Sequence, residues 1–160
     1  MERVDIKVVE AISINEIKSF VMFPFTLYRD NPYWTPPIIQ EEIDTLDKSK
    51  NPVFKNAQSN YFLALKDGVI VGRVGVMINW VEINQLKKKK VRFGWFDVID
   101  DINVTKALMQ EVYTIGKDNK MDFVEGPVGF SNLDKAGMLI KGFEENNTMI
   151  TWYNAPYYYD

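Results

Sequence analysis

The sequence contains no cysteine and no histidine. Their absence excludes disulfides, thiolate chemistry, a Ser-His-Asp triad, a Cys-His pair and the common zinc sites. Proton transfer by this chain would therefore use Asp, Glu, Tyr, Lys or water, and we expect no metal site. A chain without disulfides is also compatible with the reducing cytoplasm, which is where we expect the protein to reside.

Long apolar runs are missing too, and neither sign of charge dominates. No run approaches the roughly 18 residues of a membrane-spanning helix, and the N-terminal residues MERVDIKVVEAIS lack the apolar core of a signal peptide. The 19 basic and 22 acidic residues leave a net charge of −3, which gives no electrostatic reason to expect a membrane or nucleic-acid partner. At 46% hydrophobic content, 160 residues suit one soluble domain, 1–160.

Residues 91–127 carry the most informative pattern, which is an apolar strand, an amphipathic helix and a second apolar strand. A helix that links two buried strands in this way is the crossover that allows the strands to lie parallel in one sheet. In such sheets ligands favour the carboxyl end of the first strand and the N-terminus of the following helix. Residues 96–105 are therefore the predicted small-molecule site. The apolar stripe of the helix consists of Val104, Ala107, Leu108, Val112 and Ile115.

The N-terminal half predicts one strand and two helices. Residues 4–12 alternate as a strand does, and Ser13 with Glu16 has the spacing of a capping box that starts a helix. Pro24 should end or kink that helix. The aromatic and proline-rich residues 23–37 either cover the sheet or form a substrate-facing wall. A second helix is predicted over 38–46, with Ile39, Ile43 and Leu46 facing inward and Glu41, Glu42 and Asp44 mostly outward.

Residues 61–79 are predicted to form a β-hairpin, because Asp67-Gly68 is a favoured two-residue turn between two β-rich runs. Arg73 interrupts the apolar pattern of the second strand, so it is either paired structurally or in contact with a ligand. The lysine run 87–90 has no interleaved aromatic residues, which favours a solvated loop over a nucleic-acid site.

The element order is strand, helix, helix, strand, strand, strand, helix, strand, an α/β arrangement with a mixed sheet and a parallel pair at the central crossover. That order, with its sequence phrases, resembles the GNAT acyltransferase superfamily, and in particular a bacterial branch of it. The resemblance covers residues 20–160. The phrases that carry it are NPYWTPP (31–37), NPVF (51–54), GRV (72–74), FGWF (93–96), GP (126–127), GMLIKGF (137–143) and YNAPYY (153–158).

The resemblance implies an N-acyltransferase that moves an acyl group from acetyl-CoA or another acyl-CoA to an amine. In such folds the pantetheine lies along the fourth strand, here 93–99, and the pyrophosphate rests on amides that start the next helix, here about 101–106. The implied cofactor-binding residues are Phe96, Val98, Ile99, Asn103, Val104 and Thr105.

Two departures from the superfamily pattern leave alternatives open. The phosphate motif Gln/Arg-x-x-Gly-x-Gly/Ala is absent from residues 97–105, where Asp97, Asp100 and Asp101 would repel a pyrophosphate and Asp101 can cap the helix itself. The chain therefore also suits a non-catalytic relative that binds a small ligand or a protein. In the family the final phrase leads into a further helix and strands, so we expect the domain to be incomplete at its C-terminus and its open sheet edge to form a homodimer or strand-exchanged assembly.

Several polar side chains are candidates for chemistry, each beside a structural alternative. Glu125 lies at the end of the second parallel strand, where it can act as a general base or be paired with a cation. Tyr153 and Tyr157 can reprotonate a leaving thiolate or pack as aromatic residues. Arg73, Asn132 and Asp134 are candidates for binding a polar substrate. The alternative for Asn132 and Asp134 is a capped turn.

Overall fold

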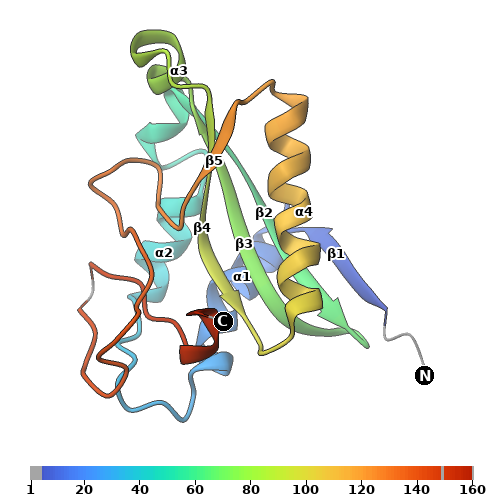
Figure 1. The fold of residues 1–160 in the computed structure, drawn as a ribbon, viewed down its shortest axis with the longest axis vertical. Coiled ribbons are helices and arrows are strands. Elements are labelled where there is room, and N and C mark those ends of the chain that lie inside the picture. Colours follow the sequence, from blue (N-terminus) through green and yellow to red (C-terminus); the bar gives the residue numbers. More distant parts are fainter. Residues whose placement is uncertain (1–4, 149, 160) are drawn as a thin grey trace.

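The computed structural model describes residues 5–148 and 150–159, so Val4 of the predicted first strand lies outside it. Strand order in the sheet follows chain order, with β4 and β5 parallel and the other neighbours antiparallel (Figure 1). The predicted mixed sheet and parallel pair are confirmed, with short helix α3 as an addition. The elements are β1 (Ile6–Glu10), α1 (Ile14–Leu27), α2 (Ile39–Leu46), η1 (Pro52–Lys55), β2 (Ala57–Lys66), β3 (Val69–Asn79), α3 (Trp80–Leu86), β4 (Lys90–Val98), α4 (Ile102–Asp118), β5 (Phe123–Glu125) and η2 (Pro156–Tyr159).

Helices cover both faces of the sheet (Figure 1). On one face α4 packs through Val104, Leu108 and Val112 into a core cluster, and on the other face α1 and α2 form a second cluster with Phe20 and Leu46. Because both faces are covered, the central strands are apolar on both sides rather than alternating. The sheet therefore separates two core clusters, one on each face.

Helix α1 begins as predicted but ends later. The Ser13 side chain accepts a hydrogen bond from the Glu16 amide, and the Glu16 carboxylate accepts one from the Ser13 amide, which completes the capping box. Pro24 does not end the helix, which continues to Leu27. A proline has no N–H to donate to the carbonyl four residues earlier, here that of Phe20. Arg73 Nη1 donates to this carbonyl at 2.8 Å, so the helix can continue without leaving it unsatisfied.

The β2–β3 hairpin turns at Asp67 and Gly68, whose φ angles of 52° and 77° confirm the predicted turn. The lysine run is a loop only in part. Residues 87–89 are exposed, but Lys90 is the first residue of β4 and its side chain is 4% exposed. The prediction of a solvated loop is therefore wrong for Lys90, because carboxylates from α3 and β5 reach its ammonium group.

A bulge interrupts β4 in its second half. Arg73 pairs with Asp97 and Gly75 with Gly94, so two steps along β3 match three steps along β4. Trp95 has a φ of 46°, in the left-handed region that costs a non-glycine residue roughly 1–3 kcal/mol. Strained residues of this kind gather at functional sites, which draws attention to residues 94–97.

Candidate functional site

The parallel strands β4 and β5 stay paired only from Lys90 and Phe123 to Arg92 and Glu125. Beyond that point they separate, and a cavity of about 550 Å³ opens between them. The predicted location of the ligand site, at the end of the first parallel strand and the start of α4, is where this cavity lies. Its apolar lining consists of Phe93, Phe96, Val98, Ile99, Ile102, Met109, Pro127 and Met138, with Tyr157 and Tyr158 at one side.

The mouth of the cavity is acidic. Asp100 and Asp101 line it at the start of α4, and the described lining contains no lysine or arginine. Asp101 caps the helix by accepting a hydrogen bond from the Asn103 amide at 3.0 Å, and it pairs with Lys66 at 3.2 Å. These contacts, led by the Asn103 amide, lower the pKa of Asp101. The negative charge of Asp101 therefore persists at neutral pH, and one of the amides at the helix N-terminus is already engaged.

Two tyrosines from η2 bind the free edge of β4. Tyr157 Oη donates to the Val98 carbonyl at 2.6 Å, and the Val98 amide donates to Tyr158 Oη at 2.7 Å. Val98 lies past the end of β5, so the hydroxyls satisfy backbone groups that have no strand partner there. Burial, with Asp100 and Asp97 nearby, raises the pKa of Tyr157 to about 12. The Tyr157 hydroxyl therefore remains protonated at neutral pH, and its hydrogen is directed at the Val98 carbonyl.

The structure brings together four of the six residues that the GNAT resemblance implied for a cofactor. Phe96, Val98, Ile99 and Thr105 line the cavity. Val104 is 0% exposed and packs into the core between α4 and the sheet. The exposed Asn103 side chain donates a hydrogen bond to Asp101. Two lining residues escaped sequence reasoning. Met109 lies one helical turn beyond Thr105 and could have been found from that spacing, whereas Met138 comes from a loop without a periodic pattern.

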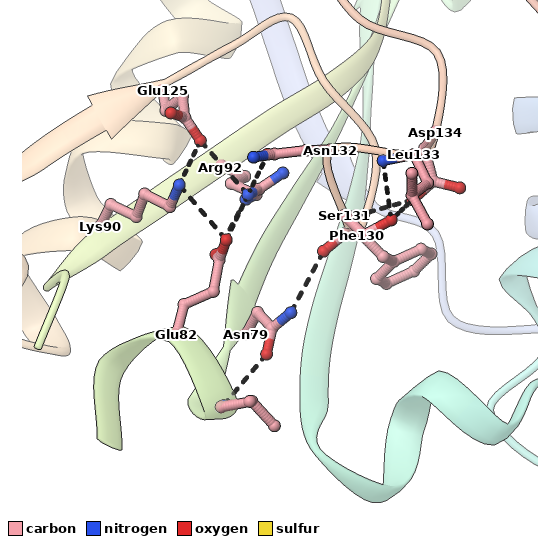
Figure 2. Close-up of polar contacts among 11 residues, drawn as sticks. Asn79, Glu82, Lys90, Arg92, Glu125, Phe130, Ser131, Asn132, Leu133 and Asp134 are labelled. Atoms are coloured by element: carbon pink, nitrogen blue, oxygen red, sulfur yellow. Dashed lines mark hydrogen bonds and ion pairs between the residues drawn. The ribbon is translucent and has the colours of Figure 1, made fainter. Parts of the chain in front are cut away.

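Glu125 belongs to a charged cluster outside the described cavity lining (Figure 2). Its Oε2 lies 2.6 Å from Lys90 Nζ and 3.5 Å from Arg92 Nη2. Arg92 also donates to both carboxylate oxygens of Glu82 and, at 2.7 Å, to Asn132 Oδ1. The hydrogen bond from Lys90 is the main reason that the pKa of Glu125 is lowered. A carboxylate held in this way is a weaker proton acceptor, and the geometry is that of the paired alternative.

The other predicted polar residues also have partners inside the protein. Arg73 Nε donates to Asp97 Oδ2 at 2.8 Å, Arg73 Nη2 lies 2.7 Å from the same oxygen, and both side chains are buried. Asp134 accepts from the Ser131 amide at 2.7 Å in a capped turn. Tyr153 accepts from Asn31 at 2.6 Å and donates to the Phe143 carbonyl at 3.3 Å. Arg73 and Tyr153 meet at a small pocket on the α1 and α2 face, away from Asn132 and Asp134.

The fold of this chain is similar to that of solved GNAT acetyltransferase structures. A tandem GNAT protein from the clavulanic acid biosynthesis pathway superposes with a TM-score of 0.56 over 73% of this chain and 34% of its own, at 11% identity. The chain has the GNAT fold. An aminoglycoside acetyltransferase from an uncultured soil metagenomic sample, in complex with sisomicin, gives a TM-score of 0.51 over 78% of each chain at 15% identity. The GNAT fold predicted from the sequence is therefore confirmed.

Sequence relatives are longer than this GNAT-fold chain. Protein YghO of Escherichia coli is 31% identical over 144 residues, which are 90% of this chain and 37% of YghO. The bacterial ceramide synthase of Caulobacter vibrioides is 25% identical over 154 residues, 96% of this chain and 40% of the synthase. The chain thus spans less than half of these curated relatives. No family model matches it. Among the described residues, no helix has both the length and the apolar character needed to cross a membrane.

Proposed function

We propose that this chain forms the acyl-donor site of an N-acyltransferase. The supporting observation is the cavity of about 550 Å³ that opens where the parallel strands of a GNAT fold separate. Its volume falls within the range of roughly 300–1,000 Å³ that is usual for small-molecule sites. An acyl-CoA bound there would supply an activated thioester carbonyl, and the acceptor would be an amine.

The lining of the cavity favours donors with an acyl chain longer than acetyl. Apolar side chains from β4, α4 and the loop after β5 surround most of the space, and its described lining offers no cation to a polar group. Each methylene that leaves water contributes about 0.8 kcal/mol, so an alkyl chain would bind such a surface well. One relative is a bacterial ceramide synthase, and ceramide is an N-acylated lipid. Transfer of a fatty acyl group is therefore the proposed reaction.

Tyr157 is the proposed proton donor. Its hydroxyl is protonated at neutral pH, lies at the cavity wall and is anchored on the Val98 carbonyl. As the amine nitrogen forms the new C–N bond and the C–S bond breaks, the sulfur takes the tyrosine proton, and the proton released by nitrogen restores the hydroxyl through solvent. Glu125 as base and Tyr153 as acid remain sequence predictions, although both are held in other contacts.

Binding of the donor can be measured by thermal unfolding. Decanoyl-CoA at about 100 times its dissociation constant should stabilise the folded protein by about 2.7 kcal/mol, a shift of several degrees. Acetyl-CoA at the same concentration should shift the midpoint less, because it lacks the alkyl chain that the cavity takes. Tyr157→Phe should retain most of the decanoyl-CoA shift and slow acyl transfer to an amine. Equal shifts with both donors would contradict the chain-length proposal, and no shift with either would contradict the donor site.

A second function is favoured by the acidic mouth. Asp100 and Asp101 stand where a pyrophosphate would have to lie, which suits a non-catalytic domain that binds an uncharged ligand or a protein. The double variant Asp100→Asn/Asp101→Asn separates the two functions, because asparagine preserves the helix cap while removing both charges. If acyl-CoA binds, the variant should show a larger thermal shift than the unmodified protein. No shift in either protein would favour the non-catalytic function.

A further inference from the structure

Four carboxylates lie in or beside β4, and Glu82 among them is engaged by Arg92 on both oxygens. The other three differ in how fully they are bonded. Asp97 accepts from Arg73 on one oxygen and from the Tyr28 hydroxyl on the other at 2.9 Å, and Glu125 is held by Lys90. Glu42 accepts from Trp95 Nε1 through Oε2 at 2.8 Å. Its Oε1 has a single long contact among the described residues, 3.8 Å to Lys135 Nζ. Glu125 Oε1 also has no hydrogen bond among the described residues, but that side chain is 41% exposed, whereas Glu42 is 15% exposed. Glu42 is therefore the largely buried carboxylate of this group with capacity for another donor.

Glu42 faces inward, although the helical pattern predicted it on the outer side of α2. Its side chain is 15% exposed, because the indole of Trp95 on the β4 bulge draws it against the sheet. It lines a pocket of about 30 Å³ with Arg73, Asp97, Trp152 and other residues. A space of that size holds one small polar group rather than a whole ligand.

The surroundings of Glu42 have the chemistry that recognises an ammonium group. A carboxylate next to an aromatic face binds a primary ammonium by charge and by cation–π attraction. Lys135 already shows this within the protein, because its Nζ lies 5.1 Å from the Trp152 ring centroid and 3.8 Å from Glu42. The loop that carries Lys135 runs beside α2 (Figure 1). The lysine marks a position that another ammonium group can take.

The small pocket and the acyl cavity share one stretch of β4. Asp97 lines the pocket and Trp95 contacts Glu42, whereas Phe96 between them lines the cavity on the other face. Alternation of side chains along a strand places the two spaces on opposite sides of the same backbone. A group bound at Glu42 would therefore lie across the strand from the proposed donor site.

We infer that Glu42 binds an ammonium group on the acceptor substrate and that Lys135 is an internal competitor for this position. The role as acceptor site rests on the proposed function. The binding of an ammonium group does not, and it can be measured without any acyl donor.

The test uses hexylamine as the probe and the fluorescence of the indoles beside Glu42 as the signal. Hexylamine should change the fluorescence saturably, and hexanol, which carries no charge, should not. Glu42→Gln keeps an acceptor for Trp95 but removes the charge, and should weaken hexylamine binding about tenfold or more. Lys135→Met should strengthen it several-fold by removing the competitor. Glu41→Gln, on the exposed side of α2, is the matched control and should leave the affinity unchanged.

The inference is overturned if the unmodified protein and Lys135→Met both fail to bind hexylamine, if hexanol binds equally well, or if Glu42→Gln and Glu41→Gln behave alike. If Glu42→Gln fails to fold by circular dichroism, Lys135→Met decides, and an unchanged affinity overturns the inference. The decanoyl-CoA shift is measured on the same proteins. Hexylamine binding that depends on Glu42, without any acyl-CoA shift, would sustain the ammonium site while rejecting the proposed transferase.

Discussion

Replacement of Arg73 by methionine should lower the free energy of unfolding by about 3–5 kcal/mol. Arg73 and Asp97 are 4% and 6% exposed, so the substitution leaves a carboxylate buried without its counter-charge. It also removes the donor to the Phe20 carbonyl, which Pro24 cannot replace. Equilibrium unfolding in urea would show the loss as a lower midpoint, provided that the denaturant slope is unchanged.

Two variants serve as controls for the Arg73 prediction. Arg73→Met/Asp97→Asn should recover part of the lost stability, because no uncompensated charge remains in the core. Lys50→Met breaks the Lys50–Asp44 pair, which is just as short at 2.6 Å but joins side chains that are 53% and 42% exposed. That change should cost no more than about 1 kcal/mol. If Arg73→Met cost as little as Lys50→Met, burial would not be what makes the Arg73 pair important.

Substitution of Gly94 by alanine should destabilise the protein by about 3 kcal/mol and abolish donor binding. A Cβ atom at Gly94 would lie 2.3 Å from the carbonyl oxygen of Val128, which is backbone and cannot rotate away. The Val128 amide donates to the Phe93 carbonyl at 2.8 Å, and Phe93 lines the cavity where the strands separate. Displacement of Val128 would therefore distort the closed end of the cavity. The measurements are urea unfolding and the decanoyl-CoA thermal shift.

Gly75→Ala is the matched control on the neighbouring strand. Its nearest contact would be 3.2 Å from a ring atom of Trp95, a side chain that can move by a few tenths of an ångström. We expect a loss near 1 kcal/mol and a retained ligand shift. Equal losses for the two alanine variants would show that the close approach of Val128 is not what requires glycine at position 94.

The features that sequence predicts well are those fixed by neighbouring residues. The capping box at Ser13, the Asp67-Gly68 turn and the apolar stripe of α4 are each encoded within a few positions, and all three are present. The crossover then located the cavity, because a helix between two buried strands constrains where the strands end. Helix α3 was missed because a pattern of seven residues is too short for helical periodicity to be recognised.

The features that escaped prediction depend on residues far away in the chain. Lys90 is buried because Glu125 of β5 reaches it, and Glu42 points inward because Trp95 holds its carboxylate. No local pattern contains those partners. The position of Met138 in the cavity wall depends on the path of a loop that has no periodic repeat, so this residue could be named only once the fold was known.

The shortness of β5 has a consequence for how the proposed acyl donor would reach its site. This strand has only three residue pairs with β4, whereas β2 and β3 pair over most of their length. Elements with few backbone hydrogen bonds open at a lower free energy than the strands at the centre of a sheet. The wall that β5 begins is tied to β4 by these pairs, by the Lys90–Glu125 ion pair and by the Val128–Phe93 hydrogen bond, so it can open at a lower free energy than β1 to β4 separate from one another. A long acyl chain could then be laid in from the side and enclosed afterwards, without threading through the acidic mouth.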